Sequence, residues 1–388
     1  MPKSRTRFVF LLPVMIVCTS LLLPATDSLP RQIADDAFWK LIEDASEPNG
    51  EFPSENFVSN EAGFQMVLPA LLEVTKSSPN GVYIGVGPEQ NFTYAAALRS
   101  KMAFVIDIRR QNMLVHLIYK ALFEMSDNRA DFIARLFSRR RPEGISKNSS
   151  VAELFNAFAP IPYDTDSYQK NLEGITNLLL TKHKFGLTRQ DQTNIEHVFL
   201  AFREYGPGIN YNSGTVTRVG APAPPNYADV MTATDTQGIQ QSYLANEENY
   251  RFIRDMEGRN MMIPLTGDFG GTKAFRAVGQ YLKDHGATVS AFYTSNVEEY
   301  LFQSSGGPVG DRNPSGTAPN FYANVAMLPL DAASTFIRSG GQGRGGLLAF
   351  MRGPSRLYSI HKTLTAIEEG RIKHYDDLFD AALQTNNP

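Results

Sequence analysis

Cysteine is almost absent from this chain, since Cys18 is the only one among 388 residues. A single cysteine excludes a disulfide framework, an iron–sulfur cluster and a cysteine-rich zinc site. The six histidines form no local metal-ligating pattern, so the sequence predicts no metal. Positive charge is not in excess either, because 37 lysine and arginine residues stand against 40 aspartate and glutamate residues. A basic excess is typical of nucleic-acid-binding proteins, and its absence argues against a nucleic-acid partner.

Two enzyme motifs are also missing. No G-x-S-x-G sequence occurs, which removes the usual nucleophile of α/β-hydrolases. The turn at 267–271 is similar to a phosphate-binding loop, but Thr272 stands where that loop needs its second glycine. We therefore expect an ordinary tight turn at 267–271. The remaining composition, with 42% hydrophobic and 11% aromatic residues, is that of a globular protein with a sizeable core.

One long hydrophobic run is present, at the N-terminus. Residues 8–25 are mostly apolar and follow Lys3, Arg5 and Arg7. A basic segment before such a run is typical of an export signal, and about 18 residues also suffice for an uncleaved membrane anchor. We expect residues 1–25 to be a signal peptide or an anchor, with a buried N-terminal helix as the remaining alternative. The positive-inside rule then places the rest of the chain outside the cytoplasm.

This segment predicts an exported protein, either periplasmic or anchored on the outer side of the cytoplasmic membrane. Its processing stays open. Val17 is larger than the residue that a lipoprotein signal carries before its cysteine, and Leu23-Pro24-Ala25 is the best candidate for cleavage. Cleavage there would remove Cys18, and membrane contact is expected only through this segment.

Beyond the N-terminus, residues 33–380 are expected to form a single α/β domain. Apolar periodicity predicts helices at 33–45, 61–74, 92–100, 112–125, 246–257, 272–284 and 357–369. It predicts strands at 82–84, 103–108, 227–233, 261–265, 288–293, 321–330 and 347–351. The strand–turn–helix order that opens the domain indicates a doubly wound, mostly parallel sheet. Residues 127–226 are expected to form a large helical insert, a candidate lid or cap, between the second and third strands.

The turn after the first predicted strand carries the main functional signal. Gly85 and Gly87 allow a ligand to approach the backbone, and the following helix N-terminus favours negative charge. Asp107 ends the next strand about 20 residues later, where an acid accepts hydrogen bonds from ribose hydroxyls. Gln90 occupies the position of the third glycine of a dinucleotide motif, which argues against NAD or FAD. The pattern predicts a small nucleoside-containing ligand; a tight turn with an ordinary strand-end acid is the alternative.

The order of these elements resembles the class I S-adenosylmethionine methyltransferase fold. The segments GVGPEQNFTY, AFVIDIRR, NMMIPLTGDFGGTKAFRAVGQYLKDHGATVSAFY and NVAMLPLD are similar to those of an uncharacterised family of exported bacterial proteins described as methyltransferase-like. This resemblance covers most of residues 33–380. It implies a Rossmann-like fold of the methyltransferase type, with S-adenosylmethionine as the candidate cofactor, and it brings no established activity.

The resemblance assigns roles residue by residue. Gly85 and Gly87 match the first two glycines of the cofactor loop, and Asp107 matches the ribose-binding acid. Asp235 matches the acid after the third strand, which approaches the adenine amino group. Asp268 falls near the catalytic edge of the fourth strand.

Three more residues complete the expected site. Glu89 replaces the third glycine of the methyltransferase loop, which places a carboxylate near the methionine part of the cofactor. Asn91 and Arg109 are expected beside the cofactor as well. Tyr83 departs from the pattern, because it stands where the loop usually carries an acid.

Three hypotheses on function follow. The first is a methyltransferase that positions donor and acceptor in line, with Asp268 or Glu89 as general base. The second is an exported, degenerate Rossmann-like protein that binds a ligand or partner without methyl transfer. The third is another enzyme that uses Glu89, Asp107 and Arg109 on a polar metabolite. The predicted export argues against the first, because S-adenosylmethionine is made and kept in the cytoplasm.

Overall fold

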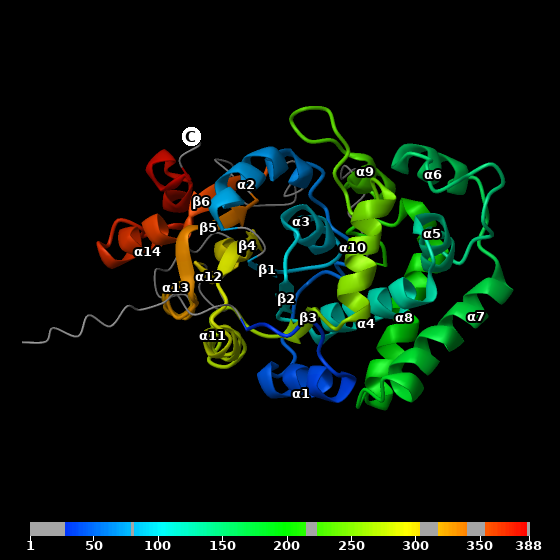
Figure 1. Cartoon of the computed structure of the whole chain (residues 1–388), viewed down its shortest axis with the longest axis horizontal. Helices are drawn as coiled ribbons and strands as arrows, with labels where there is room; N and C mark the ends of the chain where they lie inside the picture. The colour runs from blue at the N-terminus through cyan, green and yellow to red at the C-terminus, as the bar shows by residue number, and fades with distance from the viewer. Residues whose placement is uncertain (1–27, 79–80, 215–222, 303–316, 340–353, 386–388) are drawn as a thin grey trace, which may run out of the picture.

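The computed structural model describes residues 28–78, 81–214, 223–302, 317–339 and 354–385 (Figure 1). The predicted signal peptide or anchor at 1–25 and the predicted strand at 347–351 lie outside these residues. Within the described ranges, no helix combines the length and the apolar character needed to cross a membrane.

A six-stranded sheet forms the centre of the described structure, in the order β3-β2-β1-β4-β5-β6. The first five strands in this order run parallel to one another, and β6 runs antiparallel to β5. The bounds are β1 Val82–Gly85, β2 Met102–Asp107, β3 Met262–Thr266, β4 Val289–Ser295, β5 Leu330–Arg338 and β6 Arg356–Ser359. The expected α/β fold with a mostly parallel, Rossmann-like sheet is therefore confirmed.

The order of the strands reverses between β1 and β4. From β1 the chain builds outward to β2 and β3, and it then returns to the other side of β1. Every residue of the three strands β1, β2 and β3 is buried. Their continuous apolar runs are typical of parallel strands that are covered on both faces. In open sheets of this kind, ligands bind outside the carboxyl ends of the strands at the point of reversal.

Helices cover the sheet and its β3 edge (Figure 1). Helix α4 packs on β2 and β3 and against α10, α1 lies beside β3 and α11, and α14 packs on β5. The bounds are α1 Asp35–Ala45, α2 Leu68–Val74, α3 Gln90–Leu98, α4 Arg110–Met125, α10 Glu247–Gly258, α11 Ala274–Asp284, α12 Val297–Leu301, α13 Ala318–Ala326 and α14 Ile360–Glu368. The predicted helices at 33–45, 92–100, 112–125, 246–257 and 272–284 are present within a few residues.

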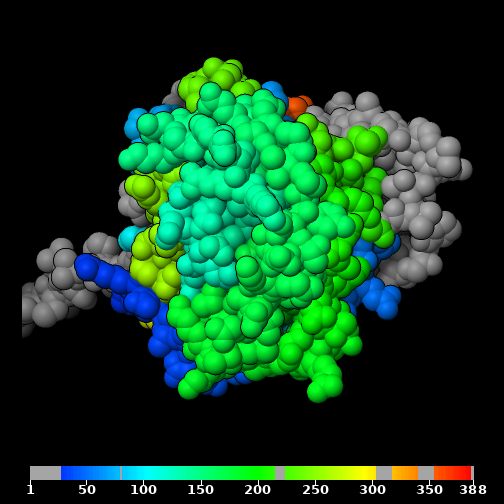
Figure 2. Space-filling model, turned by 90° about the vertical axis from the view of Figure 1, so that its right-hand side faces the viewer, coloured from blue at the N-terminus to red at the C-terminus, as the bar shows by residue number. Residues whose placement is uncertain are grey.

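The chain between β2 and β3 contains a run of further helices. Their bounds are α5 Arg129–Leu136, α6 Val151–Phe158, α7 Thr165–Thr176, a π-helical stretch Asn177–Lys182, α8 Arg189–Tyr205 and α9 Tyr227–Thr232. This helical segment makes most of the face that is shown in Figure 2, in cyan to green. Helix α8 packs directly on α4, so the segment reaches the carboxyl edge of β2.

Two of the predicted strands were wrong. Residues 227–232 form α9, because Asn226 and Asp229 make a capping box that starts a helix. Residues 318–326 form α13, which begins next to a proline, and strand β5 starts only at Leu330.

Two of the predicted helices needed correction at their N-terminal ends. The one expected at 357–369 begins as strand β6 before α14. The one expected at 61–74 begins with a 3₁₀ turn, and it exposes 41% of Leu72 instead of burying its whole surface.

Candidate functional site

An irregular segment, residues 46–63, runs along the carboxyl edge of the sheet, and we call it the strap. It starts at the β3 edge, where the backbone amide of Glu47 donates to the carbonyl of Thr266 at 2.8 Å. The amide of Gly50 then donates to the carbonyl of Ile108, just after β2, at 2.9 Å. The strap thus crosses the ends of two neighbouring strands in the order in which they lie in the sheet.

The second half of the strap continues across β1, β4 and β5. The amide of Ser59 donates to the carboxylate of Glu89, which follows β1, at 3.1 Å. The carboxylate of Glu61 accepts from the hydroxyls of Ser295, at the end of β4, and Ser339, just after β5. The strap therefore covers the edge at which ligands of this class of sheet bind.

The turn after β1 is filled by side chains of its own neighbourhood. The side-chain amide of Asn91 donates to the three carbonyls of residues 86–88, at 3.0, 3.0 and 2.7 Å. Its oxygen accepts from the hydroxyl of Tyr83 at 2.8 Å and lies 2.0 Å from where a Cβ on Gly85 would be. Gly87 has a φ of +77°, a conformation that L side chains rarely adopt. Both glycines are thus required by the local fold.

Glu89 is fully buried rather than open to a ligand. Burial raises the pKa of its carboxyl to about 7, although hydrogen bonds from backbone amides, including that of Ser59, oppose this. Its charge acts on three buried tyrosine hydroxyls nearby, those of Tyr119, Tyr227 and Tyr243. In this arrangement Glu89 connects the turn to the strap.

Asp107 and Arg109 come together at the end of β2. The carboxylate of Asp107 accepts from the backbone amides of Arg109, at 3.0 Å, and Gly87. Burial raises the pKa of Asp107, while the guanidinium of Arg109 and these amides act in the opposite direction. The structure thus brings three of the predicted site residues, Gly87, Asp107 and Arg109, into one cluster.

The guanidinium of Arg109 is buried beneath the strap, and the residue is only 6% exposed. Its Nη1 donates to the carbonyls of Ser54 and Glu55 and to the side-chain oxygen of Gln111. Its Nε and Nη2 have no hydrogen-bond acceptor among the described residues. The ring of Phe52 lies 5.4 Å from the guanidinium carbon.

Asp235 does not follow a strand, because the strand predicted before it is α9. Its carboxylate oxygens accept from the amides of Gln237 and Ile239 and from the side chain of Gln241, at 2.8, 3.0 and 3.0 Å. These contacts close a local turn. The expectation that Asp235 stands at a strand end was therefore wrong.

Asp268 follows β3, the third strand along the chain. The sequence had suggested that it follows the fourth strand. Since β3 is the edge strand, β2 separates it from the glycine turn after β1. The carboxylate of Asp268 accepts from the amide of Gly270 at 2.9 Å and shapes its own turn. The structure brings Asp268 to the carboxyl edge of the sheet, but at a distance of two strands from Gly85.

The turn that is similar to a phosphate-binding loop holds a carboxylate from the strap. Glu47 accepts from the backbone amides of Asp268, Lys273 and Ala274, at 2.8, 2.6 and 3.2 Å. The amides of Lys273 and Ala274 lie at the N-terminus of α11, where a negative charge is favoured. The protein therefore supplies its own anion to this turn.

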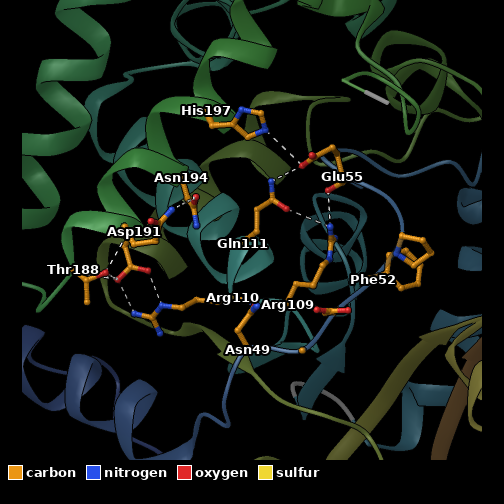
Figure 3. A pocket seen from close by; sticks show the side chains of 14 residues that line it. Asn49, Phe52, Glu55, Arg109, Arg110, Gln111, Thr188, Asp191, Asn194 and His197 are labelled. Atoms are coloured by element: carbon orange, nitrogen blue, oxygen red, sulfur yellow. Dashed lines mark hydrogen bonds and ion pairs between the residues drawn. The ribbon is translucent and has the colours of Figure 1, made fainter. Parts of the chain in front are cut away.

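An open cleft of about 880 Å³ lies beside the end of β2 (Figure 3). It is lined by residues 49–53 and 55 of the strap, by the start of α4 and by the first half of α8. Arg110 and Asp191 form one side through a bidentate ion pair with distances of 2.6 and 2.9 Å. The lining of this cleft joins three segments that are far apart in the sequence.

Another side of the cleft carries a second polar group. The carboxylate of Glu55 accepts from the side-chain amide of Gln111 at 2.8 Å and lies 3.6 Å from Nε2 of His197 (Figure 3). Sequence reasoning missed all three, because no local pattern links them. Of the predicted site residues, only Arg109 lines the cleft. In the described part of the chain, no group of three or more histidine, cysteine, aspartate or glutamate residues is arranged to hold a metal ion.

Comparisons with known proteins give a family but no activity. No curated protein matches this chain. A domain of unknown function, DUF7790, matches residues 56–366, which is most of the chain. The matched region runs from the second half of the strap to α14 and includes the glycine turn and the start of α4. This chain therefore belongs to the DUF7790 family.

Proposed function

We propose that this protein binds a nucleoside-containing ligand in the cleft between the strap, α4 and α8, and that it does not transfer methyl groups. The observation that carries the proposal is the contrast between two neighbouring places on the sheet edge. The turn at Gly85 is filled by Asn91, whereas Arg109, two residues after Asp107 at the end of β2, lines an open cleft.

The place of the ligand is supported by the strand topology. In Rossmann-like folds an acid at the end of the second strand binds the ribose of a nucleoside, and Asp107 stands at that position. Arg109, two residues later, lines a cleft whose volume of about 880 Å³ is in the range of small-molecule sites. A nucleoside in the cleft would therefore extend from the end of β2 toward α8.

The absence of methyl transfer is supported by the glycine turn. In the methyltransferases that the sequence resembles, the methionine part of the cofactor is expected near Gly85 and Glu89. Here Asn91 occupies the space over Gly85, and Ser59 of the strap is bonded to Glu89. Methyl transfer depends on holding donor and acceptor in line, and a filled turn does not offer that position.

Calorimetric titration of the purified protein with adenosine, S-adenosylmethionine and S-adenosylhomocysteine tests both parts of the proposal. We expect the three ligands to bind with dissociation constants within about threefold of one another, because only the nucleoside makes contacts. Asp107→Asn should weaken all three by about tenfold or more, since a hydrogen bond to a charged group contributes about 1.5–3 kcal/mol. Asp44→Asn, on the exposed side of α1, is the matched control and should change nothing.

Two outcomes would overturn the proposal. If S-adenosylmethionine bound more than tenfold tighter than adenosine, its methionine part would be recognised, and the absence of methyl transfer would be wrong. If none of the three bound at millimolar concentration, the nucleoside ligand would be wrong.

We also propose that the protein is exported by its N-terminal segment, residues 1–25. The basic residues before the apolar run support this orientation. A C-terminal fusion to a reporter that is active only outside the cytoplasm should be active. A reporter active only inside the cytoplasm would give no signal if the proposal holds, and a strong signal would contradict it.

A further inference from the structure

We infer that the ligand of the cleft carries an anionic group, a phosphate or a carboxylate on the ribose, which binds the guanidinium of Arg109 at the start of α4. The position of the ribose rests on the proposed function. The anionic group is supported by separate observations on the charges at this end of α4.

The start of α4 concentrates positive charge. Arg109 is the N-cap residue and Arg110 is the first helical residue, and the first turn contains no acidic side chain. The N-terminus of a helix is itself the positive end of its dipole, so most helices place acids there. Two arginines at this position are therefore unfavourable unless anions compensate them.

Arg110 already has its anion. It pairs in a bidentate manner with Asp191, whose side chain is only 3% exposed. Thr188 in turn donates its backbone amide to Asp191 at 2.9 Å and holds the carboxylate in place. The charge of Arg110 is thus used within the fold.

Arg109 lacks an equivalent partner. Its nearest carboxylate, on Asp107, lies 3.8 Å from Nε, and this carboxylate already accepts two backbone amides. Only Nη1 donates hydrogen bonds, while Nε and Nη2 have no acceptor in the described parts of the chain. A planar guanidinium with two unused donors is suited to the paired oxygens of a phosphate or a carboxylate.

The burial of Arg109 makes this arrangement significant. Buried donors are nearly always hydrogen-bonded, and those of a charged group are the most costly to leave without an acceptor. Arg109 lines the cleft while its Nε and Nη2 are shielded from solvent, so a ligand that enters beside Phe52 can supply the missing acceptor once the strap residues over these atoms move. In related nucleotide-binding folds, an arginine close to the ribose-binding acid accommodates a phosphate on the ribose.

Glu55 does not compete for this position. Its carboxylate is turned toward Gln111 and His197 and away from Arg109, which it contacts only through its backbone carbonyl (Figure 3). It is available to accept a hydrogen bond from an amino or hydroxyl group of the ligand. A nucleoside with a ribose phosphate or carboxylate offers both kinds of group.

The test compares nucleosides that differ only in the anionic group. The purified protein is titrated with adenosine, with its 2′-, 3′- and 5′-monophosphates, with adenosine 5′-carboxylic acid, and with inorganic phosphate alone. We expect at least one of the charged nucleosides to bind tenfold or more tighter than adenosine. The derivative that binds most tightly identifies the ribose position that carries the anion and whether the anion is a phosphate or a carboxylate. The gain should shrink as salt is raised, because it is electrostatic.

Arg109→Gln should abolish this gain, so that the charged and uncharged nucleosides bind the variant with affinities within about threefold of one another. Arg109→Lys keeps the charge but not the planar fork, and it should retain only part of the gain. Arg141→Gln, at an exposed site on the helical segment, is the matched control. Thermal unfolding of each variant shows that it is folded, and the comparison of ligands on the unmodified protein does not depend on any variant.

The outcomes separate this inference from the proposed function. If adenosine binds and no anionic derivative binds tighter, the inference is overturned and the nucleoside site stands. If inorganic phosphate binds in a manner that requires Arg109 but adenosine does not bind, the anion site stands and the nucleoside proposal is overturned. If nothing binds, both are overturned.

Discussion

The buried carboxylate of Glu89 accepts a hydrogen bond from the backbone amide of Ser59 at 3.1 Å, across 30 residues of sequence. This contact joins the turn after β1 to the strap that crosses the sheet edge. It also explains why a residue in a predicted ligand loop is buried. Burial of this carboxyl outweighs the hydrogen bond from Ser59, and it makes the stability of the fold depend on the protonation of Glu89.

The pH dependence of stability should reveal Glu89. Its pKa in the folded protein is about 7, above the usual value of 4.5. The folded state therefore holds the proton more tightly, and this contribution is fully present below pH 4.5 and is lost as pH rises through 7. Between pH 5 and pH 8 the free energy of unfolding should fall by about 2–3 kcal/mol through this residue alone.

Glu89→Gln removes the titration while keeping the shape of the side chain. Urea denaturation at pH 5, 6, 7 and 8 measures the free energy of unfolding of both proteins. The value for the unmodified protein should fall relative to that of the variant as pH rises. Glu143→Gln, at an exposed position, should follow the unmodified protein at every pH. Parallel curves for Glu89→Gln and the unmodified protein would contradict the assignment.

The packing of the glycine turn can be measured with a double-mutant cycle. In Gly85→Ala the new Cβ would meet the side-chain oxygen of Asn91 at 2.0 Å, so we expect a loss of about 2–3 kcal/mol in the free energy of unfolding. In the background of Asn91→Ala the same change should cost at least about 1 kcal/mol less, because the nearest obstructing atom is gone and only the hydroxyl and Cε1 of Tyr83, at 2.6 and 2.9 Å, remain. Gly208→Ala, where an added Cβ meets no described atom within 4 Å, is the control. Strict additivity of the two changes would show that Asn91 does not fill the turn.

The anion position at the start of α11 predicts a rescue by added anions. Glu47→Ala leaves the amides of Asp268, Lys273 and Ala274 without their acceptor and should lower stability by about 1–3 kcal/mol. Sulfate should stabilise this variant more than it stabilises the unmodified protein, since it can occupy the vacated turn. Glu43→Ala, exposed on α1, should respond to sulfate as the unmodified protein does. An equal response of both variants would rule out an anion position at this turn.

The ion pair between Arg338 and Glu298 should be important for stability because it is buried. The two side chains meet at 2.8 and 2.9 Å, and each is about 1% exposed. Arg338→Met leaves a buried carboxylate unpaired and should cost about 3–5 kcal/mol.

A second change tests the reason for that cost. Adding Glu298→Gln to Arg338→Met removes the unpaired charge and should recover at least about 1 kcal/mol in urea denaturation. Lys40→Met breaks an exposed pair with Asp44 and should change stability by less than about 1 kcal/mol. If the double variant were less stable than Arg338→Met, the unpaired charge would not be the cause.

The first half of the sheet was predictable because its signals are local. Strands β1 and β2 are short apolar runs, and α4 repeats its apolar residues at helical spacing, so all three were located within two residues. The two incorrect strands show where this reasoning stops. Residues 227–232 and 318–326 are rich in apolar and aromatic residues in the manner of a strand, but a capping box and a proline at the helix start outweigh this tendency.

The candidate site was predictable only in part. Gly87, Asp107 and Arg109 meet as expected, because the ends of adjacent parallel strands lie side by side. The cleft side chains Glu55, Gln111 and His197 come from three separate segments, and no spacing in the sequence relates them. The role of Glu47 at α11 was hidden for the same reason, since more than 200 residues separate the carboxylate from the amides.

The amino-acid pattern alone was sufficient for the α/β class and the mostly parallel sheet, because short apolar strands and the helices between them are local signals. It predicted Gly85 and Gly87 as positions where a ligand approaches the backbone, whereas the structure requires glycine there because of Asn91 and of the positive φ at Gly87. Whether the glycine turn is open to a ligand depends on the strap and on Asn91, and the strap carries no periodic signal. Its course is set by single hydrogen bonds to the ends of five strands, which exist only once the sheet has formed. The folded structure therefore fills the expected ligand position and leaves an open cleft beside Arg109, whose Nε and Nη2 have no hydrogen-bond acceptor among the described residues.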